Sequence, residues 1–110
     1  MPYDQVLADR IGHLVTGEEG LSQQRMFGGL AFLVNGNMAV AASGQGGLLV
    51  RVGAYDAEAW IDDERVMPML MRGRPMRGWL RIVSDLTDSE LEQWVSRGVA
   101  YARWLPSKGT

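Results

Sequence analysis

The chain begins with a helical pattern of apolar residues. Between residues 4 and 15, apolar side chains recur at spacings of three and four, as Leu7, Ile11, Leu14 and Val15. This spacing places them on one face of an amphipathic helix. Gly17 and Gly20 follow and end the predicted helix.

The next four segments have the composition of short strands. They are rich in apolar residues and lie at residues 25–29, 30–36, 37–43 and 47–53. Asn35-Gly36 tolerates positive φ at both central positions of a turn, so it favours a tight hairpin. The "SGQGG" segment predicts a looser turn before the last of these strands. Together the segments predict an antiparallel meander.

The strand predicted at residues 30–34 is apolar on both faces. Leu30, Phe32 and Val34 alternate with Ala31 and Leu33. A sheet face that is open to water normally carries polar residues at alternate positions. Because three helices would not cover both faces, we expect the second face or a sheet edge to contact another subunit, which predicts a homodimer.

The second half of the chain is less regular. Residues 54–63 contain good helix formers and predict a short helix. In residues 65–78 the methionines alternate as on a strand, but two prolines and two glycines interrupt the segment: Pro68, Gly73, Pro75 and Gly78. This indicates an edge strand or an irregular loop. Residues 79–84 return to a strand pattern.

The C-terminal helix has the clearest boundaries. Thr87 and Glu90 have the spacing of a capping box, and Leu86 with Leu91 has that of a hydrophobic staple. One face then carries Leu91, Trp94, Val95, Gly98, Tyr101, Ala102 and Leu105, before Pro106. Because glycine inside a helix costs about 1 kcal/mol relative to alanine, Gly98 indicates a close approach to the sheet.

These segments predict a single α+β domain over residues 1–110. The expected order is α-β-β-β-β-α-β-α, with helices packed on an antiparallel sheet of about five strands. A chain of 110 residues can bury the core of one such domain.

The composition of the chain excludes several kinds of site and predicts the compartment in which the protein resides. The chain has no cysteine, which excludes disulfides, thiolate catalysis and cysteine-based zinc sites. No apolar run approaches the roughly 20 residues of a spanning helix, and the N-terminus lacks the order of a signal peptide. We therefore expect a cytoplasmic protein without a membrane partner. The net charge of −2 gives no overall attraction to nucleic acid.

Few residues are candidates for catalysis or metal binding. His13 is the only histidine and has no Ser or Cys at a recognisable motif spacing. The acids Asp62, Asp63 and Glu64 lack the spacing of a calcium loop and are expected at the polar end of a helix. The glycine pairs match no phosphate-binding motif. We expect no enzymatic activity, no metal and no cofactor.

Arg, Met and Trp concentrate in residues 65–81. The candidate partner-binding residues are Met69, Met71, Arg72, Arg74, Arg77 and Trp79. Met side chains repack easily and suit an adaptable protein-binding surface. Alternatively, guanidinium groups beside a Trp suit phosphates and bases, and this nucleic-acid interpretation adds Arg25, Arg51 and Arg81. The plain alternative is a core of Met and Trp under a solvated surface of Arg.

Three motifs together resemble the TfoX N-terminal domain family, which is related to the competence regulators TfoX and Sxy. They are Met-Phe-Gly-Gly at Met26 to Gly29, a strand ending in Arg51-Val52, and Gly73 to Met76 followed by Gly78-Trp79. The resemblance covers roughly residues 10 to 104. It implies a small α+β fold like that of secretion chaperones, with helices on one side of an antiparallel sheet.

The resemblance also implies a regulatory function. Larger family members regulate DNA-uptake genes and carry a second, C-terminal domain that looks able to bind nucleic acid. This chain ends at Thr110, so we expect a domain of the N-terminal type alone. The family supplies no catalytic residues. We expect a non-enzymatic, dimeric interaction module whose partner is an unknown protein, with weak nucleic-acid binding as the alternative.

Overall fold

The computed structural model describes residues 3–107 except for residues 27, 63 and 84. This part of the chain forms three helices: α1 (Gln5–Val15), α2 (Ala54–Trp60) and α3 (Asp88–Trp104). It also forms six strands: β1 (Leu21–Met26), β2 (Gly29–Val34), β3 (Asn37–Ala42), β4 (Leu48–Arg51), β5 (Val66–Met71) and β6 (Arg74–Ile82). The α+β prediction is confirmed, although the sheet has six strands rather than about five.

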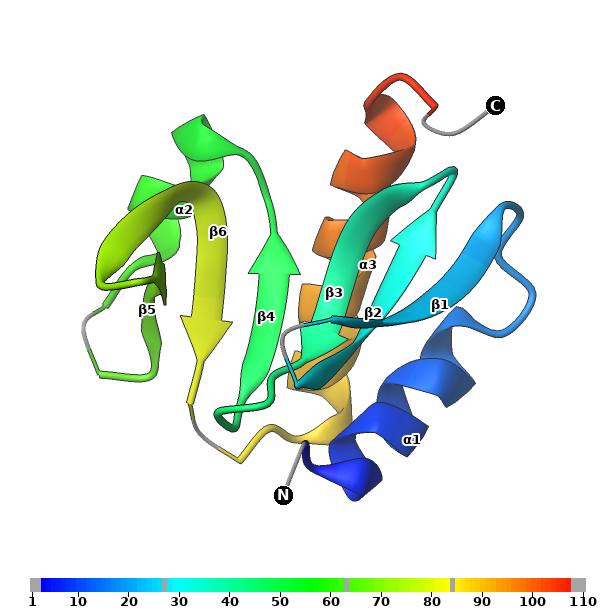
Figure 1. The fold of residues 1–110 in the computed structure, drawn as a ribbon, viewed down its shortest axis with the longest axis horizontal. Helices are drawn as coiled ribbons and strands as arrows, with labels where there is room; N and C mark the ends of the chain where they lie inside the picture. The colour runs from blue at the N-terminus through cyan, green and yellow to red at the C-terminus, as the bar shows by residue number, and fades with distance from the viewer. Residues whose placement is uncertain (1–2, 27, 63, 84, 108–110) are drawn as a thin grey trace.

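The strands form one antiparallel sheet in the order β1-β2-β3-β4-β6-β5. All three helices pack on one face of it, with α3 against β3 and β4, α2 against β6, and α1 beside α3 (Figure 1). One core cluster joins Ile11, Ala57 and Leu91 of the helices to Phe32 and Val50 of the sheet. The opposite face carries no helix in the part of the chain that the structure describes.

The alternation in β2 separates the two faces of the sheet. Leu30 and Phe32 pack in the core beneath the helices, whereas Ala31 and Leu33 line the opposite face. In β3, Ala39 is an extra residue opposite the Phe32/Leu33 step of β2. This bulge lets two successive residues of β3 be buried on the helix side.

Residues 65–78 contain β5, a tight turn and the start of β6. The β-hairpin formed by β5 and β6 accounts for the sixth strand. β5 is an edge strand that contains Pro68, as expected, but β6 begins at Arg74 rather than at residue 79. The turn is Arg72-Gly73, with φ angles of 54° and 77°. Asn35-Gly36 has the same left-handed pair, at 54° and 81°. Tight hairpins favour Asn or Asp before Gly, so Arg72 gave no sequence signal for this turn.

Two further boundaries differ from the sequence prediction. The first strand covers residues 21–26 rather than 25–29. Its side chains are mostly polar and exposed, so no apolar pattern marks it, and its backbone pairing with β2 defines the strand. The second helix ends at Trp60, and Ile61 is already extended. The parts of the predictions that fall on Phe27, Asp63 and Ser84 lie outside the described residues.

The ends of α3 are closed by side chains. The capping box is confirmed, because Thr87 Oγ1 accepts the Glu90 N–H and the Glu90 carboxylate accepts the Thr87 N–H. At the other end, the buried Asn37 side chain donates to the carbonyls of Ala102 and Pro106. This amide ties the C-terminus of α3 to the start of β3.

Gly98 lets α3 approach the backbone of β3, as its position in the helix indicated. A Cβ atom at this position would lie 2.5 Å from the Ala39 carbonyl oxygen and 2.8 Å from Val40 Cγ1. Backbone atoms have little room to move away in a paired central strand. A side chain at residue 98 would therefore push the helix off the sheet.

None of the described helices is both long and apolar enough to span a bilayer.

Asp62 organises the connection from α2 to β5. Its Oδ1 accepts three backbone N–H groups, those of Glu64, Arg65 and Val66. These donors stabilise the ionised form and hold the pKa of the Asp62 carboxyl below its usual value of 3.8. The N–H of Thr87 and the side chain of Arg65 lower the pKa of Glu90 in the same way.

We expect Gly98→Ala to destabilise the protein. In an exposed helix this change would stabilise by about 1 kcal/mol, but overpacking against β3 costs about 1–3 kcal/mol. Urea unfolding should therefore show a net loss, whereas Ser96→Ala on the exposed side of α3 should change stability by less than about 0.5 kcal/mol. A gain in stability for Gly98→Ala would contradict the close contact.

We also expect acid to weaken the α2–β5 connection through Asp62. Because its folded pKa lies below the unfolded value, the carboxylate stabilises the fold above that value, and the contribution is lost as pH falls through the folded pKa. Between about pH 5 and pH 2, the unfolding free energy of the wild type should fall more steeply than that of Asp62→Asn. Glu92→Gln, at an exposed position of α3, serves as the control. Parallel curves for wild type and Asp62→Asn would refute this.

Candidate functional site: a methionine-lined groove

The face of the sheet opposite the helices contains a groove of about 860 Å³, here called the open-face groove. Residues from all six strands line it. The strand register places one row of side chains across its whole width: Gln24, Ala31, Ala41, Leu49, Arg81 and Met67.

Small side chains form the floor of the groove. Ala31 and Ala41 are only 1% and 5% exposed, yet neither belongs to the core clusters on the helix side. Larger side chains on both sides of them therefore provide their cover. Two alanines flanked by longer residues leave a depression in a face that would otherwise be level.

Methionines form much of the walls. Six of the seven methionines of the chain line the groove: Met26, Met38, Met67, Met69, Met71 and Met76. They come from four strands, β1, β3, β5 and β6. Unbranched thioether side chains adapt their shape to a ligand at low cost, so this lining suits a variable apolar surface. Leu70 at the outer wall is 57% exposed.

The charged residues of the groove are all cationic. Arg51, Arg72 and Arg81 line it, and no Asp or Glu is among its described lining residues. The whole chain carries a net charge of −2. The described lining of the groove is therefore positively charged although the chain as a whole is slightly acidic.

Arg51 lies between two aromatic rings at one end of the groove. Its guanidinium carbon is 5.5 Å from the centroid of Trp79, its register partner on β6, and 5.6 Å from that of Tyr101 on α3. These are cation–π distances. The rings hold the guanidinium in place without neutralising it.

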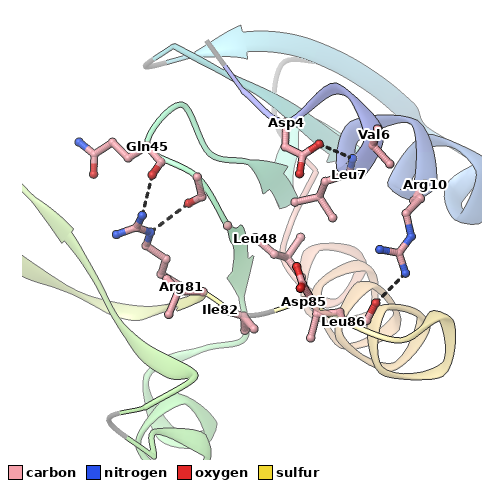
Figure 2. Close-up of a pocket in the computed structure, with 13 residues that line it drawn as sticks. Asp4, Val6, Leu7, Arg10, Gln45, Leu48, Arg81, Ile82, Asp85 and Leu86 are labelled. Atoms are coloured by element: carbon pink, nitrogen blue, oxygen red, sulfur yellow. Dashed lines mark hydrogen bonds between the residues drawn. The ribbon is translucent and has the colours of Figure 1, made fainter. Parts of the chain in front are cut away.

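Arg81 has a structural role in addition to its charge. Its guanidinium donates to the carbonyls of Gln45 (2.8 Å) and Gly46 (3.1 Å) in the β3–β4 loop (Figure 2). The side chain separates the open-face groove from a second hollow of about 660 Å³ beside α1. In this second hollow, Arg10 donates to the Leu86 carbonyl and Asp4 caps the Leu7 N–H (Figure 2). The charged side chains of Asp4, Arg10 and Arg81 are thus engaged in contacts within the fold, and Asp85 also lines this hollow.

A family model for the TfoX N-terminal domain matches residues 13–102 of the chain. The chain belongs to the TfoX N-terminal domain family. No curated protein and no solved structure matches it significantly. The family match agrees with the resemblance carried by the Met-Phe-Gly-Gly and Gly-Arg-Pro-Met motifs.

The structure brings together only some of the residues predicted for the site of this TfoX N-terminal domain. Met69, Met71, Arg72 and Trp79 line the open-face groove, as do Arg51 and Arg81 of the nucleic-acid set. Three predicted residues are exposed but do not line it: Arg25, Arg74 and Arg77. The bulge of β6 around Gly78 and the turn at Arg72-Gly73 separate arginines that are close in sequence.

Sequence reasoning missed the opposite wall of the groove. Met26, Leu33 and Met38 line this wall, and none of them is among the candidate site residues that the sequence predicts. The apolar second face of β2 and the downstream methionines belong to one surface of the TfoX N-terminal domain. Periodicity alone could not show this, because β6 and β4, which connect the two walls, are neighbours only in the folded sheet.

The remaining chemical candidates lie away from the groove. His13 is exposed on α1, on the helix side of the sheet. The Asp62 carboxylate accepts hydrogen bonds from the backbone of the α2–β5 connection. The prediction that it lies at the polar end of a helix is therefore wrong. Within the described residues, no cluster of three or more His, Cys, Asp or Glu has the arrangement of a metal site.

We expect Arg81→Met to destabilise the β3–β4 loop of the TfoX N-terminal domain. Two charge-assisted hydrogen bonds are lost, at a net cost of about 1–2 kcal/mol for a partly exposed group. Arg74→Met removes an exposed arginine for which the structure shows no hydrogen bond, and should stay within about 0.5 kcal/mol of wild type. Urea unfolding measures both variants, and equal stabilities would show that the Arg81 contacts contribute nothing.

Proposed function

We propose that the protein is a cytoplasmic, non-enzymatic interaction module whose open-face groove binds another protein in a regulatory setting. The observation that carries this proposal is the uncovered apolar face of the sheet, with its lining of six methionines. Membership of the TfoX N-terminal domain family supports the regulatory setting. The absence of cysteine from the chain suits a reducing compartment.

The composition of the groove favours protein binding over catalysis. Protein interfaces are enriched in Met, aromatic residues and Arg, and their centres are depleted of carboxylates. The groove contains each of the enriched types, including Trp79 and Arg51. A general acid or base would require a titratable group in the groove, and its described lining includes no His, Asp or Glu.

Dimerisation stays a prediction. The apolar residues on both faces of β2 predict that a second copy of the chain covers this face or a sheet edge. Sedimentation at tens of micromolar distinguishes the two occupants, because a clean monomer there contradicts the homodimer and leaves the groove for a different protein.

Nucleic-acid binding is the second candidate function. The observation in its favour is the pair Arg51 and Trp79 at the end of the groove, which combines a cation with a stacking surface. Against it, Arg81 donates to loop carbonyls and Arg25 does not line the groove. Binding through phosphates weakens steeply with salt, whereas binding through apolar contacts changes little.

The double variant Met69→Asp/Met71→Asp should lose the protein partner. It places two carboxylates in the apolar wall on an edge strand, where the fold tolerates substitution better than in the sheet centre. Partners are captured from native lysate with the wild type, purified, and titrated directly against each variant. We expect affinity to fall at least about tenfold for the double variant.

Val6→Asp is the matched control for this titration. Val6 is an exposed apolar residue on α1, on the helix side, and its substitution also introduces a carboxylate. It should leave the affinity unchanged, and far-UV circular dichroism should confirm that both variants are folded. Equal affinities for wild type and the groove variant would reject the open-face groove as the binding site.

A further inference from the structure

We infer that the open-face groove takes an acidic amphipathic helix of a partner protein. This inference rests on the proposed function and specifies the chemistry of the partner. It follows from three properties of the groove: its position on a sheet face, its unneutralised arginines, and the spacing of those arginines.

The position on a sheet face favours a helix over an extended strand. An added strand must pair with free backbone groups at a sheet edge. The floor strands β2, β3 and β4 are each paired on both sides, so their backbone offers no ladder to a ligand. A helix satisfies its own backbone hydrogen bonds and can place one apolar face in the groove.

The charges favour an acidic partner. Arg10, Arg65 and Arg103, which do not line the groove, form ion pairs with Asp88, Glu90 and Glu18. By contrast, the structure shows no carboxylate partner for Arg51, Arg72 or Arg81 within the described residues. Their positive charge is therefore not neutralised. The guanidinium groups of Arg51 and Arg72 suit bidentate contact with carboxylates, whereas Arg81 contributes charge alone because it donates to the Gln45 and Gly46 carbonyls.

The same charges disfavour a second copy of this chain in the groove. A two-fold dimer through the open face would place the same patch on both sides of the interface. Both sides of the interface would then carry Arg51, Arg72 and Arg81, with no acidic groove residue to compensate. Juxtaposition of like charges across an interface is unfavourable.

The spacing of two arginines matches a helix that runs along the strands. Arg51 is the register partner of Trp79, which lies two residues from Arg81 on β6. Two residues of a strand span about 7 Å. Carboxylates at positions i and i+4 of a helix are separated by about 6 Å along its axis. The backbone positions of the two arginines are therefore spaced along the strands much like two acids on one helical face.

The probe for this inference is a synthetic helical peptide of about 18 residues, which is about 27 Å long. This length fits the molecule, whose shorter dimensions are 29 and 28 Å. The acidic peptide carries Leu on one face and Glu on the other. A basic peptide with Lys in place of Glu is the charge control, and a scrambled acidic peptide without helical periodicity is the shape control.

We expect the acidic helix to bind at least about tenfold more tightly than either control peptide, as measured by fluorescence anisotropy at low salt. Its preference over the basic peptide should shrink at high salt because the charges are partly exposed. Arg51→Glu and Arg72→Glu should each weaken the acidic peptide about three- to tenfold and strengthen the basic one. Arg25→Glu, at an exposed arginine outside the groove, should change neither.

Three results would overturn the inference. Equal binding of acidic and basic peptides would show that the arginines do not select the ligand. Equal binding of the scrambled peptide would show that no helix is recognised. A dimer that Met69→Asp/Met71→Asp dissociates would show that a second copy occupies the groove. If the peptide fails while the captured partner still requires Met69 and Met71, this inference is wrong and the proposed function stands.

Discussion

The contact between α3 and β3 determines how the rest of the molecule is arranged. Gly98 places the helix directly on the Ala39 carbonyl, and Asn37 binds the carbonyls of Ala102 and Pro106 at the helix end. These contacts hold the longest helix against the centre of the sheet. With α1 and α2 on the same side, the helices cover one face of the sheet. Within the described residues, the other face is covered by no helix and carries the side chains of the strands.

The uncovered face of the sheet matters both for the packing of the protein and for its proposed function. An antiparallel sheet with one face in water normally carries polar residues there, but this one carries Ala31, Leu33 and Leu49. The methionines of β1, β3, β5 and β6 form much of the walls of the groove around these residues. A surface of this kind is stable in the free protein and retains apolar area that a partner can cover.

The arginines divide into groups by their partners. Those on the helix side, such as Arg10 and Arg103, form ion pairs that connect distant parts of the chain. Arg97 lies between the rings of Trp60 and Trp94, at 4.4 and 4.6 Å from their centroids, and joins α2 to α3. Arg51 and Arg81 are held by rings and loop carbonyls, which orient their charge without cancelling it. The arginines with observed contacts therefore have three different physical roles in this small domain.

Local signals in the sequence were sufficient for the elements they specify. The capping box at Thr87, the Asn35-Gly36 hairpin and the alternation of β2 predicted structure correctly because each depends on neighbouring residues. The Arg72-Gly73 turn was missed because strand pairing with β6, rather than turn propensity, imposes its positive φ angles. The sequence also determined that the face is apolar and that methionine and arginine gather near residue 70. Only the tertiary structure decided that these features form one groove, since the order β3-β4-β6-β5 brings its two walls together across a floor of alanines.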